Sequence, residues 1–144
     1  MRIEAQRPIV WRVSLRASPA QAWPLLDTDA GRQRHWALKS EPTPGGFRLT
    51  FPGAIQGVVQ VLERRPERLL RILYFGSTCT LELEPDGEGT LFTATDDCSD
   101  LADWADRHAG WVSWLLIFKA AADHQIDLRG HRPDRHWFGR FADP

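Results

Sequence analysis

Cysteine, tyrosine, methionine and lysine are scarce in this sequence, and long hydrophobic runs are absent. Two cysteines, Cys79 and Cys98, stand among 144 residues, with one tyrosine and one methionine. A chain of this length buries about two-thirds of its unfolded surface, so it needs neither disulfides nor a structural metal to fold. No run approaches the ~18 apolar residues of a membrane span, and the first residues lack the apolar core of a signal peptide. We therefore expect a cytoplasmic protein with reduced thiols.

An excess of charge of one sign is missing too. The 18 Lys and Arg oppose 19 Asp and Glu, for a net charge of −1. Proteins dedicated to nucleic acids usually carry a basic face and a high pI, so no nucleic-acid partner is expected. Hydrophobic residues at 42% and charged residues at 26% exclude a disordered chain. The length favours a single domain over residues 1–144.

The N-terminal part predicts one strand followed by two short helices. Apolar and polar residues alternate over residues 9–17, which predicts a strand with one buried face. Ser18, a proline at the first helical position and Gln21 form a capping box at the start of a helix. Pro24 lies inside this helix and predicts that it is short or kinked. Asp27-Thr28-Asp29 can cap a second short helix, which is expected to end near Trp36.

The middle of the chain predicts β-structure, and its last part predicts a long helix. Residues 40–46 are rich in proline and glycine and are expected to form a loop. Turn residues then separate five strand segments joined by hairpins: residues 46–51, 55–64, 68–75, 77–84 and 90–96. A helix is predicted over residues 100–128, and an irregular tail over 131–144. This order predicts an α+β fold in which an antiparallel sheet curls around the long helix.

The long helix has an apolar arc wider than an ordinary surface helix needs. Packing in the core accounts for such an arc, and a cavity or a second subunit facing part of it is the alternative. Two polar residues, His108 and Lys119, fall within the arc and share a face, since they are close to three turns apart. Lys119 either pairs with Asp123, reaches solvent or anchors a ligand beside a pocket.

Three parts of the chain together resemble a known family. They are the segment 13–23 with the helix and Trp36 that follow, the strand and turn 57–70 with Arg65-Pro66-Glu67-Arg68-Leu69, and the ending with Gly110-Trp111, Leu116, Lys119-Ala120 and Ile126-Asp127-Leu128-Arg129. Each motif alone is weak, but their order and spacing resemble the START-related SRPBCC superfamily. Within it, the chain is most similar to the branch named for the activator of heat-shock-protein ATPase.

The resemblance implies a helix-grip fold, in which a curved antiparallel sheet wraps around the C-terminal helix and leaves a cavity between them. Related folds carry lipids, sterols, polyketides or hormones. The family has no universal catalytic motif, so no catalytic residue is carried over. Two departures from the family are Pro24 in the first helix and the short segment 40–46, which predicts a small cavity mouth.

Motifs for metal, nucleophilic or acid–base chemistry are missing from the sequence. The five histidines form no metal-binding pattern and are expected to be solvated. No nucleophile-elbow or phosphate-binding motif is present, so neither a metal nor a cofactor is expected. Cys79 is predicted to be a small core residue. Asp96 and Asp97, at a strand end, point apart and suit a turn or cap better than acid–base work.

These observations predict a protein that binds a small apolar or amphipathic molecule, lipid-like or polyketide-like, in the cavity. The candidate ligand-binding residues are Trp36, Phe51, Tyr74, Phe92, His108, Trp111, Leu115 and Lys119. One alternative is a polyketide cyclase or aromatase in which His108 or Tyr74 moves protons. Another is an interaction module of the chaperone-activator type. A homodimer through exposed apolar residues also stays open, with these candidates: Leu69, Leu73, Trp137, Phe138 and Phe141.

Overall fold

The computed structural model describes residues 8–98, 102–130, 132 and 140. Its elements follow one another as β1 (Ile9–Leu15), α1 (Pro19–Asp27), α2 (Asp29–Gln33), β2 (Lys39–Thr43), β3 (Gly46–Phe51), the 3₁₀ turn η1 (Pro52–Ala54), β4 (Ile55–Arg65), β5 (Leu69–Tyr74), β6 (Ser77–Asp86), β7 (Gly89–Asp96) and α3 (Trp104–His124). In these residues the strands form one antiparallel sheet in the order β1-β7-β6-β5-β4-β3-β2.

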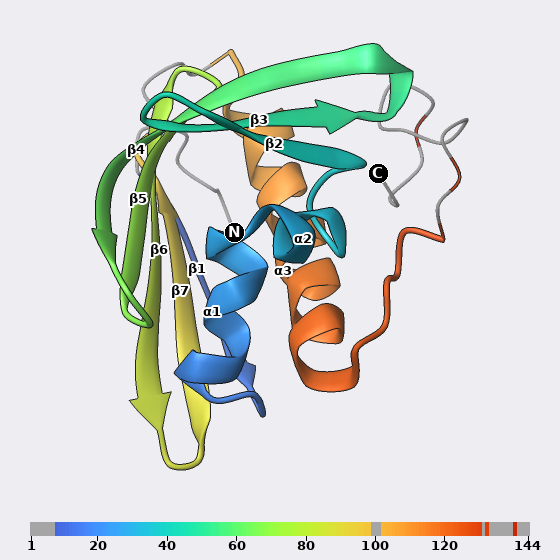
Figure 1. Cartoon of the computed structure of the whole chain (residues 1–144). Helices are drawn as coiled ribbons and strands as arrows, with labels where there is room; N and C mark the ends of the chain where they lie inside the picture. The colour runs from blue at the N-terminus through green and yellow to red at the C-terminus, as the bar shows by residue number, and fades with distance from the viewer. Residues whose placement is uncertain (1–7, 99–101, 131, 133–139, 141–144) are drawn as a thin grey trace.

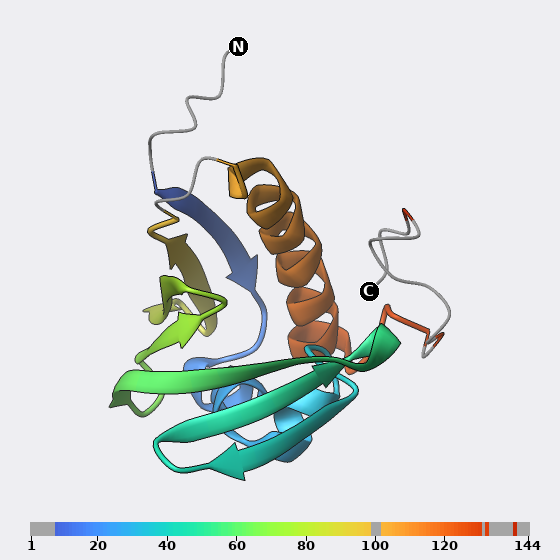
Figure 2. The same ribbon diagram turned by 90° about the horizontal axis from the view of Figure 1, so that it is seen from above.

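The sheet bends around α3, and α1 and α2 pack at one side of the space between them (Figure 1). Seen from above, β2, β3 and β4 cross below the long helix while β1 and β7 stand beside it (Figure 2). Every strand from β2 to β7 pairs with its neighbour in the chain, and β1 closes the far edge by pairing with β7. The architecture is therefore the α+β helix-grip fold that the resemblance implies.

The N-terminal helices begin where the sequence predicts. Ser18 caps α1, since Gln21 N–H donates to Ser18 Oγ at 3.2 Å and Ser18 N–H donates to Gln21 Oε1 at 2.9 Å. The helix continues through Pro24 but is short, ending at Asp27. Thr28 then caps α2 through its hydroxyl, which accepts from the Gly31 N–H. These local signals depend on a few neighbouring residues and are therefore readable from sequence.

Two of the sequence predictions are wrong in detail. Residues 40–46 are not a loop, because most of them belong to β2, which pairs with β3 at the edge of the sheet. Pro42 is tolerated there because an edge strand leaves backbone N–H groups without a ladder partner. The long helix ends at His124 rather than near residue 128, because Gln125 adopts a left-handed conformation with φ 53°. Residues 99–101 and most of the tail lie outside the described residues.

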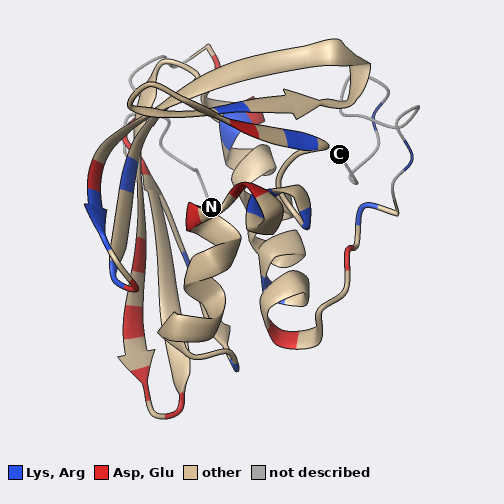
Figure 3. Cartoon of the chain, viewed as in Figure 1, with Lys and Arg blue, Asp and Glu red and all other residues tan. Residues whose placement is uncertain are grey.

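The core lies between α3 and the concave face of the sheet, and most charged residues lie away from it, with Arg32, Asp96 and Arg129 as buried exceptions. The fully buried side chains there include Phe47, Phe92, Phe118 and Leu81. Many charged residues lie on β4, β5 and β6 and in the β6–β7 turn (Figure 3). None of the helices in the described residues has the length and apolar character of a membrane span. Polar and apolar residues thus separate as the alternation predicts.

Candidate functional site

A pocket lies between α3 and the sheet, where β3 and β5 end and β4 begins. Its volume is about 330 Å³. It is lined by His35, Trp36, Phe51, Pro52, Ile55, Tyr74, Phe75, Asp103, Asp106, Arg107, Gly110, Trp111, Ser113, Trp114 and Ile117. The lining is mostly aromatic and aliphatic, and its charged members come from the first turn of α3 and the residue before it. This is the cavity position that the helix-grip resemblance implies.

Aromatic side chains form the walls of this pocket. Trp36 meets Tyr74 edge to face, with ring centroids 5.7 Å apart, and Trp36 Nε1 donates to Tyr74 Oη at 3.3 Å. Trp111 lies on the other side of Tyr74, at 6.2 Å between ring centroids. Such tilted contacts hold the rings at fixed angles. The walls are therefore braced against one another rather than free to collapse inwards.

Half of the predicted binding residues lie in this pocket. Trp36, Phe51, Tyr74 and Trp111 line it, although they come from the turn after α2, from β3, from β5 and from α3. Phe92 and Leu115 are not among the lining residues, since both are buried in the core. Phe92 packs against Phe118 at 4.7 Å between ring centroids. Alternation along β7 correctly predicts that Phe92 points into the interior. It does not predict whether Phe92 lies in the packed core or at the pocket.

His108 and Lys119 face β1 rather than the pocket. The His108 ring stacks on Trp11, with centroids 5.4 Å apart at 22°, and Trp104 covers it from 4.7 Å. Lys119 Nζ donates to the Ser14 carbonyl and to Asp123 Oδ2. The predicted pair with Asp123 is thus present within α3, and the bond from Lys119 to the Ser14 carbonyl ties α3 to β1. The two residues share one side of the helix as expected, but neither lines the pocket.

Asp96, the last residue of β7, is the centre of a buried polar network that fixes α3 to the sheet. Its Oδ1 accepts from Ser77 Oγ at 2.6 Å and from the Cys98 backbone N–H at 3.0 Å. Its Oδ2 accepts from Arg107 Nε and Trp111 Nε1, both at 2.8 Å. The bond to Cys98 is the turn role that the sequence suggests. The ion pair with Arg107 has no signal in the sequence, because its partners meet only in the fold.

The Arg107 guanidinium donates hydrogen bonds to groups of the protein itself. Besides Asp96, its Nη2 donates to the Tyr74 carbonyl at 3.1 Å and its Nη1 to the Phe75 carbonyl at 3.3 Å. Burial acts to lower the pKa of Arg107, but the Asp96 carboxylate outweighs it and leaves that pKa above its ordinary value. The guanidinium thus stays charged, its charge is balanced by Asp96, and it holds the end of β5 against α3.

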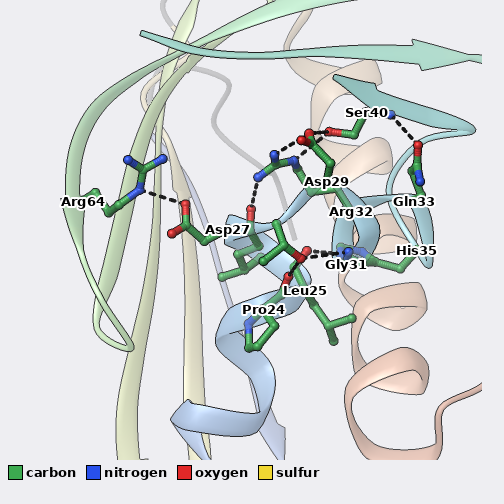
Figure 4. A network of polar contacts seen from close by, with 12 residues as sticks. Pro24, Leu25, Asp27, Asp29, Gly31, Arg32, Gln33, His35, Ser40 and Arg64 are labelled. Atoms are coloured by element: carbon green, nitrogen blue, oxygen red, sulfur yellow. Dashed lines mark hydrogen bonds and ion pairs between the residues drawn. The ribbon is translucent and has the colours of Figure 1, made fainter. Parts of the chain in front are cut away.

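His35 is a pocket residue that the sequence predicts wrongly, since it is 1% exposed rather than solvated. Its Nε2 lies 2.8 Å from the Leu25 carbonyl (Figure 4). Because a carbonyl only accepts, Nε2 carries the proton and Nδ1 is a bare acceptor. Burial lowers the pKa of His35 to about 4, so the ring is neutral near pH 7. A signal for its burial exists in hindsight, because it stands between the buried Arg32 and Trp36.

Arg32 holds α2, and with it the segment that carries His35 and Trp36, against the sheet. Its Nε donates to Ser40 Oγ at 2.9 Å and its Nη2 to Asp29 Oδ1 at 2.8 Å (Figure 4). The guanidinium also lies 3.7 Å above the centroid of the Phe47 ring. Burial lowers the pKa of Arg32, partly offset by Asp29. These contacts set the position of one pocket wall.

The site offers binding surface rather than an obvious reaction centre. Burial raises the pKa of Tyr74 to about 12, so its hydroxyl keeps its proton near pH 7. Burial also raises the pKa of Cys79, which is 0% exposed and is therefore a core thiol, as predicted. Cys79 and Cys98 are not joined by a disulfide. Among the residues that the structure describes, no cluster of His, Cys, Asp and Glu could hold a metal ion.

Comparison with known proteins shows the fold. The sequence matches no protein-family model and no curated protein sequence. The structure is similar to the protein SSP2350 from Staphylococcus saprophyticus, with a TM-score of 0.74, 15% identity, and coverage of 85% of this chain and 96% of the other. It is also similar to the Aha1 dimer from Colwellia psychrerythraea, with a TM-score of 0.71, 20% identity, and coverage of 81% of this chain and 96% of the other. A third similar structure is CalU16 from Micromonospora echinospora, with a TM-score of 0.68, 18% identity, and coverage of 94% of this chain and 81% of the other.

Proposed function

We propose that this protein binds a small apolar or amphipathic molecule in the pocket between α3 and the sheet. One observation carries the proposal: the pocket is walled by Trp36, Phe51, Tyr74 and Trp111, and its volume of about 330 Å³ is not filled by side chains. Protein interiors normally close such space by packing. Apolar pockets of ~300–1,000 Å³ with a few placed polar groups are the usual form of a small-molecule site.

The size and chemistry of the walls indicate how the ligand would be held. Burial of apolar surface contributes roughly 25 cal/mol per Å², so a ligand of two or three fused rings gains most of its affinity from the walls. The small volume favours such a compact ligand over a long acyl chain. Among the ligands that the sequence allows, this supports a polyketide-like molecule over an extended lipid.

Enzymatic turnover in this pocket has less support. Of the two residues expected to move protons in a cyclase, Tyr74 lines the pocket and His108 does not. The raised pKa of Tyr74 and the lowered pKa of His35 both lie far from the neutral range in which general acids and bases work best. Binding without chemistry is therefore the function that the geometry supports best.

A pocket-filling variant tests the proposal. Ile55 lines the pocket at the start of β4, and Ile55→Trp would occupy part of it. Val58→Trp is the matched control, because Val58 lies on the same strand, is 63% exposed and does not line the pocket. Equilibrium dialysis measures the binding of naphthalene to each protein. We expect the wild type and Val58→Trp to bind it equally, and Ile55→Trp to bind it at least tenfold more weakly.

Native mass spectrometry of freshly purified protein gives an independent measurement. A stoichiometric bound molecule that disappears in Ile55→Trp and remains in Val58→Trp would support the pocket. If no apolar probe binds the wild type and no molecule copurifies with it, the ligand-binding function is wrong. Light scattering on the same sample tests the homodimer, for which Leu73 is 38% exposed but Leu69 is buried. The other dimer candidates, Trp137, Phe138 and Phe141, lie outside the described residues.

A further inference from the structure

Three side chains that line the pocket carry polar atoms whose hydrogen bonding is incomplete. Among the described residues, His35 Nδ1 and Trp114 Nε1 are buried without a hydrogen-bond partner. Tyr74 Oη accepts from Trp36 Nε1, so its own hydroxyl proton is not used in that bond. Buried polar groups in native proteins are nearly always paired, so unpaired ones at a cavity call for an explanation.

The three groups are uncharged, and their roles are fixed by chemistry. An indole N–H only donates, so Trp114 supplies a donor. Tyr74 keeps its proton, since burial raises its pKa to about 12, and it supplies a second donor. His35 uses its Nε2 proton on the Leu25 carbonyl, which leaves Nδ1 as an acceptor (Figure 4). The residues that line the pocket therefore include two neutral donors and one neutral acceptor.

The charged residues of the pocket do not favour an anionic ligand. The positive charge of Arg107 is balanced by Asp96, whose Oδ2 lies 2.7 Å from Arg107 Nη2. Arg107 also donates hydrogen bonds to the Tyr74 and Phe75 carbonyls. The other two charged lining residues, Asp103 and Asp106, are both acidic and exposed. A carboxylate entering here would lose its hydration, find no free cation and approach two negative charges.

We propose, building on the ligand-binding function above, that the pocket selects an uncharged aromatic molecule that carries a hydroxyl or carbonyl group, and that it excludes carboxylates. A hydroxyl group can donate to His35 Nδ1 while accepting from Trp114 Nε1 or from the Tyr74 hydroxyl. A carbonyl group can accept from either donor. The aromatic walls would bind the ring system, and the neutral polar groups would select its substituent.

Three probes with one skeleton separate these contributions: naphthalene, 2-naphthol and 2-naphthoate, in equilibrium dialysis at pH 7. At this pH the phenol is neutral and the carboxylic acid is ionised. We expect 2-naphthol to bind at least tenfold more tightly than naphthalene. We expect 2-naphthoate to bind at least tenfold more weakly than naphthalene. Binding of 2-naphthol no tighter than naphthalene overturns the proposal, and so does binding of 2-naphthoate as tight as that of 2-naphthol.

Two variants then identify the groups that recognise the hydroxyl. Trp114→Phe and Tyr74→Phe each remove one donor and keep an aromatic ring, and Trp114→Phe breaks no hydrogen bond of the described residues. We expect at least one of them to reduce the preference for 2-naphthol over naphthalene by fivefold or more. Phe51→Leu is the control, because it changes the wall without touching a polar atom and should weaken both ligands by the same factor.

The outcomes separate this proposal from the one on which it rests. If none of the three probes binds and no molecule copurifies with the protein, the ligand-binding function is wrong, and the proposed selectivity is wrong with it. If naphthalene binds but both donor variants keep the full preference for 2-naphthol, the pocket function stands and the assignment of the polar groups is overturned. A preference lost in a donor variant and kept in Phe51→Leu supports it.

Discussion

The space between α3 and the sheet is filled at one end and hollow at the other. At the filled end, Phe92 and Phe118 are 0% exposed, and their ring centroids lie 4.7 Å apart. At the hollow end, Trp36, Tyr74 and Trp111 surround a pocket of about 330 Å³. Both ends are rich in aromatic residues, so composition alone does not decide whether an interior is closed or open.

The difference lies in how the aromatic rings are held. At the filled end, they are held by contact with one another and with aliphatic neighbours, which gains most when no space is left. At the hollow end, they are held by directional bonds: Trp111 donates to Asp96 and Trp36 donates to Tyr74. A ring whose position is fixed by a hydrogen bond does not need a neighbour on every side. The buried ion pair therefore acts as a brace for the pocket.

The largest expected effect is the loss of packing at the filled end. Phe118→Ala removes a fully buried ring and should lower the free energy of unfolding by about 4 kcal/mol, because a cavity is left in a well-packed region. Phe75→Ala, at a ring that is 50% exposed beside the pocket, should cost no more than about half of that. Urea denaturation measures both values. Equal losses would remove the distinction between the two ends.

The second effect is the loss of the brace. Asp96→Asn keeps the size of the side chain but leaves Arg107 buried without its counter-charge, and it should cost about 3 kcal/mol in the free energy of unfolding. Ser77→Ala removes one hydrogen bond to the same carboxylate and should cost about 1 kcal/mol. If Asp96→Asn is no worse than Ser77→Ala in urea denaturation, the ion pair does not hold the hollow end together.

The third effect is a dependence of stability on pH that arises from His35. Burial lowers the pKa of His35 from its ordinary value of 6.5 to about 4 in the folded protein, so the unfolded chain binds the proton more readily. The contribution to stability is complete above pH 6.5 and is lost as the pH falls towards 4, which amounts to about 2 kcal/mol between pH 7.5 and pH 5. Urea denaturation at these two pH values measures it.

A histidine replacement provides the control for this pH effect. His35→Gln retains a side-chain N–H for the Leu25 carbonyl but does not titrate. It should be less stable than the wild type at pH 7.5, yet it should lose much less stability between pH 7.5 and pH 5. A variant with the same pH slope as the wild type would assign the slope to another group.

The fold could be predicted from local signals, whereas the site could only be predicted in part. Strands and caps follow from alternation and from Ser18 with Gln21, because neighbouring residues decide them. Trp36, Phe51, Tyr74 and Trp111 were predicted as binding residues from alternation, the apolar helix arc and the expected cavity, and all four line the pocket. The sequence suggests the turn role of Asp96, but it does not predict the ion pair with Arg107, because an ion pair across distant elements leaves no periodic pattern.

The smallest effect compares the buried ion pair with an exposed one. Arg64 Nε lies 2.8 Å from Asp27 Oδ1, with the two side chains 48% and 18% exposed, whereas Asp96 is 0% exposed in its pair with Arg107. Arg64→Ala should lower the free energy of unfolding by less than about 1 kcal/mol, because water screens the exposed pair and replaces the lost contact. Raising the salt concentration should shrink this loss further, while the loss in Asp96→Asn should hardly change. Urea denaturation at low and high salt tests both statements, and a salt-insensitive loss of about 3 kcal/mol in Arg64→Ala would show that burial is not what distinguishes the two pairs.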